Sequence, residues 1–263
     1  MDDILVSDDW REGWIRAADG SLMSVRYANV GGWAVFEGGI ILDTTEHMEN
    51  VADRIRRYPE IVTQNRLDLL GLRITNPGNK WQVTGQFYEV AYEVSPDLAN
   101  VNLVKSAMTH WEANTKIRFK RRTGQAHYIS IVPENYCASH VGRQQGQQNI
   151  WLSANCSEGN VIHEIGHAVG LWHEHSRPDR DDFIEVVAQN VDPRARYNFD
   201  KQAYNAQAFG AYDFGSIMHY SGNAFSLNGQ PTIRPKPGNG DPEFGQRKAL
   251  SAGDIATVNA LYP

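Results

Sequence analysis

The sequence predicts an α+β fold for this chain of 263 residues. Strand-like and helix-like patterns alternate through the middle of the chain, and the stretch from about Ser176 onward is irregular and rich in Gly, Pro, Asn and Tyr. A helix pattern returns near the C-terminus. We therefore expect a mixed α/β first part of the main domain and an irregular second part that closes with a helix.

The first patterned elements lie near the N-terminus. Short apolar runs at Trp33–Phe36 and Ile40–Leu42 predict two strands. Thr44 or Thr45 can cap a following helix, and Pro59 ends it because proline has no amide hydrogen. These elements form a small unit ahead of the main domain.

The strongest break in this half of the chain is NPGNK, at Asn76–Lys80. We expect a domain boundary there, with residues 1–75 as an N-terminal segment and residues 76–263 as the main domain. Within the main domain, residues 76–175 carry the regular elements and residues 176–263 carry the irregular part.

Regular elements follow in the main domain. FYEVAYEV, from Phe87 to Val94, alternates as a half-buried strand does. Ser95 is expected to cap a helix that has Pro96 in its first turn. Further strands are expected to begin near Lys116, His127 and Asn149, and the last helix is capped by Ser251 with Asp254 at position N3.

Composition and charge exclude two classes of partner. The formal net charge is −6 without a basic stripe, so nucleic acid is not expected. No run approaches the roughly 18 apolar residues of a spanning helix, so a membrane is not expected either. The acidic start, MDDILVSDDW, has no visible export signal. From their number alone, Cys137 and Cys156 are either buried thiols or a disulfide.

The chemistry of the chain is concentrated in HEIGHAVGLWH, from His163 to His173. Residues four apart lie on one face of a helix, so His163 and His167 can offer two imidazole nitrogens to one ion. Gly170 can end the helix in a left-handed conformation and let the chain bring His173 to the same ion. Three neutral nitrogens leave one coordination position open, which is typical of catalytic rather than structural zinc.

Glu164 lies about 100° further round this helix, where it can contact a water at the ion and act as a general base. The motif therefore predicts one Zn²⁺ per chain and hydrolysis by an activated water. Asn160 is expected to cap the helix. A purely structural interpretation, in which the helix only fills the core, does not account for three histidines and a glutamate on it.

The motif and later stretches resemble a known family. HEIGHAVGLWHEHSRPDRDDF together with SIMHY, Ser216 to Tyr220, is similar to the astacin branch of the metzincin zinc peptidases, and the likeness runs from about Trp81 to Tyr262. The resemblance implies a metzincin-like fold with a mixed, mostly parallel twisted sheet and two long helices. It also implies a secreted metalloendopeptidase made as a zymogen, whose signal peptide is not in this chain. Its partners would be protein or peptide substrates and an activating protease.

The resemblance implies roles for single residues as well. Met218 would lie beneath the zinc, and Tyr220 would be a further zinc ligand that moves away to stabilise the tetrahedral oxyanion. Glu174 would pair with the ammonium group of the mature N-terminus. Cys137 and Cys156 match the family disulfide, which implies an oxidising compartment.

The N-terminal segment resembles a pro-segment that is removed on activation. WAVFEGGIILDTTEHM is similar to the family motif FEGD, in which the aspartate blocks the zinc, but Gly39 stands at the aspartate position. Asp43 is the preferred replacement, and Glu37 and His47 are further candidates. A steric block without a zinc ligand, or no inhibition at all, are the alternatives. The cleavage site is expected between Asn65 and Lys80.

Substrate selection is the last expectation. An extended substrate can add as a strand to an exposed edge at NIWLS, from Asn149. In the family, the region of Arg234 and Lys236 borders the pocket for the residue after the scissile bond, which favours Asp or Glu there; two solvated charges are the alternative. Other functions that fit the motif are a zinc-binding interaction protein with little or no catalysis and a zinc hydrolase of small amides or esters.

Overall fold

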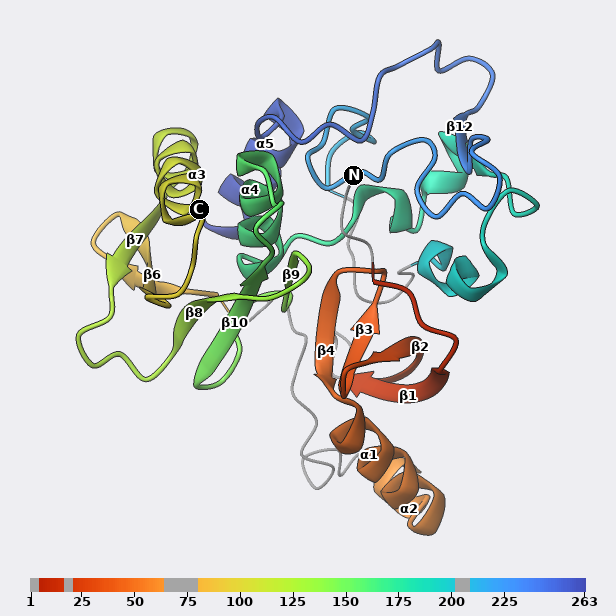
Figure 1. Ribbon diagram of the computed structural model, residues 1–263, viewed down its shortest axis with the longest axis horizontal. Helices are drawn as coiled ribbons and strands as arrows, with labels where there is room; N and C mark the ends of the chain where they lie inside the picture. The colour runs from red at the N-terminus through yellow and green to blue at the C-terminus, as the bar shows by residue number, and fades with distance from the viewer. Residues whose placement is uncertain (1–4, 17–20, 64–79, 202–208) are drawn as a thin grey trace.

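The computed structural model describes residues 5–16, 21–63, 80–201 and 209–263. The predicted domain boundary at residues 75 and 76, and nearly all of the predicted cleavage window, lie outside these residues. Most of the N-terminal segment is described before that gap and most of the main domain after it. The contacts between the two parts can therefore be traced (Figure 1).

A single mixed sheet of ten strands runs through the described part of the chain, in the order β1-β2-β3-β4-β9-β10-β8-β6-β5, with β7 also paired to β6. Within the main domain the pairs β6–β7, β6–β8 and β8–β10 are parallel and the pairs β5–β6 and β9–β10 are antiparallel, which confirms the predicted mixed sheet with parallel strands. The bounds are β1 Trp10–Arg16, β2 Leu22–Val30, β3 Trp33–Phe36, β4 Ile40–Thr44, β5 Gln82–Thr84, β6 Phe87–Val94, β7 Ile117–Arg121, β8 Tyr128–Pro133, β9 Ala138–Ser139 and β10 Gln147–Leu152.

Both the N-terminal segment and the main domain contain helices. The N-terminal segment has α1 (Thr45–Arg57) and α2 (Glu60–Thr63), and the main domain has α3 (Val101–Asn114), α4 (Glu158–Ala168) and α5 (Ala252–Leu261). As expected, the second part of the main domain is largely irregular. Besides α5, its regular pieces are 3₁₀ turns at Glu174–Ser176, Arg180–Asp182 and Pro193–Phe199, and a small sheet of β11 (Ile184–Val186) and β12 (Ile233–Pro235).

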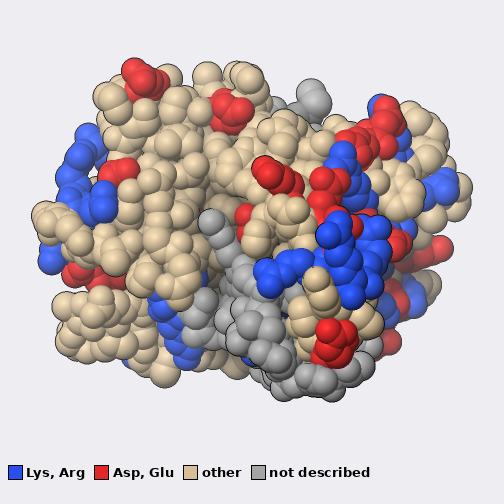
Figure 2. All heavy atoms as spheres, turned by 90° about the horizontal axis from the view of Figure 1, so that it is seen from below, with Lys and Arg blue, Asp and Glu red and all other residues tan. Residues whose placement is uncertain are grey.

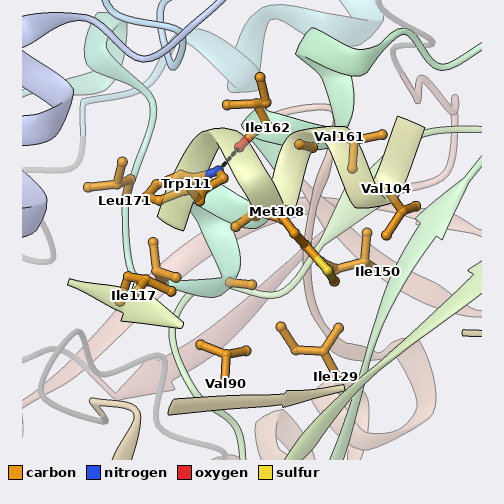
Figure 3. Packing of buried hydrophobic residues seen from close by; sticks show 14 of the residues in the cluster. Val90, Val104, Met108, Trp111, Ile117, Ile129, Ile150, Val161, Ile162 and Leu171 are labelled. Atoms are coloured by element: carbon orange, nitrogen blue, oxygen red, sulfur yellow. Dashed lines mark hydrogen bonds between the residues drawn. The ribbon is translucent and has the colours of Figure 1, made fainter. Parts of the chain in front are cut away.

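The main core lies where α3 packs against α4 and the sheet. Trp111 of α3 is fully buried, and its indole N–H donates to the carbonyl of Ile162 in α4 at 3.1 Å (Figure 3). Val90, Ile129 and Ile150 rise from three neighbouring strands to meet the same helix pair. This packing fixes α4 against the sheet, and α4 carries the first two histidines of the motif.

Two helix starts differ from the sequence prediction. The helix expected from Ser95 begins instead at Val101, because Ser95 forms a turn and the Asn100 side chain donates to the carbonyl of Ser153. The cap of α4 is Ser157 rather than Asn160. Asn160 is the N3 member of a capping box, in which each side chain accepts from the other residue's backbone N–H.

The N-terminal segment continues the sheet of the main domain. Its antiparallel strands β1–β4 reach β9 through a parallel bridge between Ile40 and Ser139. Both faces of this junction are apolar: Phe36 contacts Trp172 edge-on at 6.2 Å between ring centroids, and Trp33 contacts Trp151 at 5.2 Å. The sequence prediction found β3, β4 and α1 but missed β1 and β2.

The predicted free edge at NIWLS is wrong. Residues 149–152 lie in β10, which is paired with β8 on one side and with β9 on the other. The short strand β9 therefore lies between β10 and the N-terminal segment, and β4 in turn pairs with β9. While β4 is paired with β9, this edge of the sheet is not open to an added strand.

The surface carries no large single-sign region on the face seen in Figure 2, where basic side chains lie beside acidic ones. Among the described residues, no helix combines the length and the apolar character needed to cross a bilayer.

Candidate metal centre

The helix α4 places two histidines, His163 and His167, on one of its faces. Its capping box at Ser157 and Asn160 fixes the first turn, and the helix then runs without interruption through His163 and His167. These residues are four apart, so their rings lie one turn from each other on one face, with ring centroids 4.7 Å apart.

The third histidine arrives because the helix ends sharply. Gly170 has a φ of +109°, a conformation that side-chain-bearing residues rarely adopt. The N–H of Gly170 donates to the carbonyl of His167, and that of Leu171 to the carbonyl of Gly166. The chain then extends and places His173 beside the other two rings, as the sequence predicted.

The three rings converge through their Nε2 atoms. One ligand nitrogen from each of His163, His167 and His173 lies within 4.8 Å of the others, and the Nε2 atoms of His163 and His173 are 3.3 Å apart. Every Nδ1 meets an oxygen acceptor: the carbonyls of Ile217 and Leu171, both at 2.8 Å, and Oε2 of Glu37 at 2.7 Å. These bonds put the proton of each ring on Nδ1 and leave Nε2 as the lone-pair donor.

The arrangement fits Zn²⁺. Zn–N bonds of about 2.0–2.1 Å at a tetrahedral angle separate two nitrogens by roughly 3.3–3.4 Å. His167 is fully buried, and its Nε2 has no hydrogen-bond partner, which is costly unless an ion fills the site. Burial lowers the pKa of His163 and His173 well below the usual value and that of His167 to about 4, so all three rings are neutral at pH 7, as metal ligation requires.

A methionine turn lies directly against α4. A Cβ added at Gly166 would come within 2.7 Å of the sulfur of Met218, so only glycine permits this approach. Asp254, at position N3 of α5, holds the methionine turn. Its carboxylate accepts from the Ser216 hydroxyl at 2.6 Å and from the N–H of Ile217 at 2.9 Å. Because the Ile217 carbonyl orients His163, the last helix supports the metal centre through this turn.

Two of the three histidines line a pocket that the predicted catalytic side chains line as well. Glu164 and Tyr220 line it together with His163 and His173, and further lining comes from Asn160, Arg247, Cys137 and the stretch Glu37–Gly39. Glu164 and Tyr220 are both buried. The Tyr220 hydroxyl donates to the backbone carbonyl of Glu37 at 2.5 Å, and its ring lies against His173 with centroids 4.7 Å apart. The role of Tyr220 as a zinc ligand stays a prediction.

Of the carboxylates expected to block the zinc, the structure brings Glu37 to the site. Its carboxylate meets Nδ1 of His173, on the side of the ring away from the converging Nε2 atoms. Asp43, which the sequence favoured, does not line the pocket; its carboxylate accepts from the N–H of Thr44 and lies 3.9 Å from His47. Glu37 therefore reaches the site and Asp43 does not, while a block of the zinc by a carboxylate stays a prediction.

Glu174 is largely buried beside the methionine turn. Its carboxylate accepts from Arg177 at 3.0 Å and from the N–H of Asp213 at 2.8 Å, and its own N–H donates to the carbonyl of Met218. Burial raises the pKa of Glu174 to about 7, although these hydrogen bonds oppose the shift. Its pairing with a mature N-terminus stays a prediction.

Cys137 and Cys156 form a disulfide, as expected. It joins the segment before β9 to the residue that precedes the capping box of α4.

The predicted specificity residues lie elsewhere. Arg234 is an exposed residue of β12, and Lys236 is half-buried just after it; neither lines the pocket at the histidines. A preference for Asp or Glu after the scissile bond stays a prediction.

Sequence reasoning missed several groups that shape the centre. Arg247 donates to the carbonyls of Ile217 and His219, at 2.9 and 3.1 Å, and so holds the methionine turn together with Asp254. The only signal for Asp254 was its place in a capping box, and Arg247 had none. The carbonyls of Ile217 and Leu171 carry no side-chain signature at all.

The sequence matches a known peptidase family over most of its length. The family model for astacin, described as a peptidase family, matches residues 73–263. Among curated relatives, Protein SpAN of Strongylocentrotus purpuratus is 45% identical over 172 residues, covering 61% of this chain and 28% of that protein. Blastula protease 10 of Paracentrotus lividus is 41% identical over 185 residues, covering 66% of this chain and 31% of that protein. The chain therefore spans less than a third of the length of these relatives.

A solved structure is similar over most of its own length. High choriolytic enzyme 1, a hatching enzyme zinc-protease from the medaka fish Oryzias latipes, matches with a TM-score of 0.66 and 34% identity, covering 70% of this chain and 94% of that one. The matched part of this chain thus corresponds to nearly the whole of a zinc-protease domain.

Proposed function

The chain belongs to the astacin family of zinc peptidases, and from that membership we propose that it is a zinc-dependent metalloendopeptidase that hydrolyses internal bonds of protein or peptide substrates. The observation that carries the proposal is the convergence of three buried, neutral histidines, two of which, His163 and His173, line a pocket together with Glu164 and Tyr220. The three histidines would hold one Zn²⁺ per chain. Structural zinc has four protein ligands, whereas three leave a position for the reaction.

The residues of the pocket divide the chemistry between them. Bound zinc supplies polarisation of the substrate carbonyl and a water whose pKa is lowered to about 7. Glu164 takes the proton of that water during attack and delivers it to the leaving amine. Tyr220 donates its hydroxyl hydrogen to the negative charge that develops on the carbonyl oxygen.

Replacing Glu164 with glutamine tests this proposal. The trimmed enzyme, from which the N-terminal segment has been removed, is expected to digest an unfolded protein such as reduced casein. Glu164→Gln is expected to lower the rate by about 10²-fold or more, because glutamine cannot accept the proton. Zinc content should be unchanged, since the three ligands remain. The rate is followed by release of new amino termini.

Two controls separate zinc peptidase chemistry from a contaminant. A chelator should stop digestion by the parent enzyme, and added zinc should restore it. Glu185→Gln, at an exposed position of β11 away from the pocket, should leave the rate unchanged. Digestion that survives both the chelator and Glu164→Gln would refute the proposal. Zinc binding without any digestion would instead favour a zinc-binding interaction protein.

The tyrosine hydroxyl has its own test. Tyr220→Phe in the trimmed enzyme is expected to lower kcat by about 10²-fold with little change in KM, because loss of one donor to the oxyanion affects mainly the transition state. Ring packing against His173 and His175 is kept by phenylalanine, so zinc content should stay at the parent level. An equal kcat for the two enzymes would remove Tyr220 from the mechanism.

The N-terminal segment is proposed to keep the enzyme inactive. We assign residues 1–75 to a pro-segment that an activating protease removes, and residues 76–263 to the catalytic domain, with 76–175 and 176–263 as its two subdomains. Two contacts support this: β4 covers β9, the edge of the main-domain sheet, and the Glu37 carbonyl occupies the Tyr220 hydroxyl. Secretion into an oxidising compartment is supported by the disulfide between Cys137 and Cys156.

A further inference from the structure

One of the three zinc-site histidines depends on the N-terminal segment for its hydrogen bond. His163 and His167 donate their Nδ1–H to backbone carbonyls of the main domain, at Ile217 and Leu171. His173 donates instead to the carboxylate of Glu37, 136 positions away in the sequence, at 2.7 Å. The side chains of His173 and Glu37 are 3% and 0% exposed, so this is a dry contact between two parts of the chain.

We propose that Glu37 is a positioning residue for the zinc ligand His173, so that the N-terminal segment raises the affinity of the full chain for Zn²⁺. The proposal rests on the proposed zinc site and adds to the blocking role of the segment. In this role the segment helps the uncleaved chain to keep bound zinc, and its removal then frees the site for substrate.

The backbone around Glu37 is bent to make this contact. Glu37 has a φ of +45°, which is uncommon for a residue with a side chain, and Gly38 follows at +65°. The turn lets one residue meet the centre twice: the carbonyl of Glu37 accepts from Tyr220, and its carboxylate accepts from His173. Phe36, packed against Trp172, holds the turn in place.

A charged acceptor has a larger effect on a ligand than a carbonyl does. The carboxylate fixes the orientation and tautomer of the His173 ring and makes its Nε2 a stronger electron donor to the metal. Loss of such an outer partner typically weakens metal binding by about 10- to 100-fold. Coupling is reciprocal, so bound zinc must also hold the N-terminal segment more tightly to the main domain.

The test uses the full chain and Glu37→Gln, which keeps the size and an acceptor oxygen but removes the charge. The dissociation constant for Zn²⁺, measured by competition with a chromophoric chelator, is expected to rise about tenfold or more. Glu46→Gln, the same change at an exposed position in the first turn of α1, should leave it unaltered. Asp43→Asn should leave it unaltered as well, because the Asp43 carboxylate accepts within its own segment.

A second measurement reports on the hydrogen bond itself. In zinc-loaded chain labelled with ¹⁵N-histidine, the Nδ1–H signal of His173 should move in Glu37→Gln, while those of His163 and His167 should not. An unchanged zinc affinity would overturn the proposal. A weaker affinity with an unmoved His173 signal would overturn it too, because Glu37 would then act on the metal directly.

Failure of this proposal can be told apart from failure of the proposed function. Zinc affinity is measured without any substrate, so a chain that digests no protein but binds zinc more weakly after Glu37→Gln supports the inference alone. Conversely, an active zinc peptidase whose zinc affinity is indifferent to Glu37→Gln refutes the inference alone. A parent chain that binds no zinc refutes both.

Discussion

Replacing His167 with alanine is expected to leave the chain without bound zinc and to reduce peptidase activity to below about 10⁻⁴ of the parent level. His167 supplies one of the three histidine nitrogens of the site, and its Nε2 makes no hydrogen bond, so the nitrogen has no other role in the described structure. Without zinc, the pocket loses both the activated water and the polarised carbonyl, and Glu164 then has no acidic water proton to accept. Zinc per chain, measured by atomic emission after dialysis, should fall from one to near zero.

A second histidine provides the matched control. His127 also makes a hydrogen bond through Nδ1, accepting from the N–H of Gly146 at 2.9 Å, but it lies outside the triad. His127→Ala should therefore keep one zinc and full activity. If His167→Ala retained a full equivalent of zinc, the three-histidine site would be wrong.

Local sequence signals predicted those elements of the fold whose partners lie nearby. The strand Phe87–Val94 was predicted to the residue because its alternation is long and a proline follows it. The Ser95 helix start failed because the same residues suit a turn, and the choice was made by a distant contact from Asn100 to the loop after β10. Strands β1 and β2 were missed because their partly exposed faces mix charged and apolar residues.

In the candidate site, too, features set by nearby residues could be predicted and features set by distant contacts could not. The three histidines could be predicted because one helix and its glycine terminus carry them all within eleven residues of sequence. The groups that orient them could not, since the Ile217 carbonyl lies 54 positions from His163 and Glu37 lies 136 positions from His173. The sequence prediction preferred Asp43 to Glu37, but it is Glu37 that lines the pocket, because a left-handed turn at this residue brings its carboxylate there.

Removal of the N-terminal segment is expected to raise peptidase activity by roughly 10³-fold. The Glu37 carbonyl holds the Tyr220 hydroxyl, and freeing such a donor to the oxyanion is worth about 10²- to 10³-fold by itself. Departure of β4 also uncovers β9, the edge that an extended substrate needs. The experiment introduces a specific protease site within residues 65–79, cuts the chain, separates the two pieces and compares digestion of casein before and after.

Cutting alone should not suffice, because the segment is held by more than its covalent link. Apolar contacts at Phe36–Trp172 and Trp33–Trp151, together with the β4–β9 bridge, keep it docked after the bond is broken. Activity should therefore follow the fraction of segment that has dissociated, and adding the purified segment back should inhibit. Full activity in the uncut chain would mean that β4 and Glu37 do not obstruct the site, since the same contacts would then coexist with substrate.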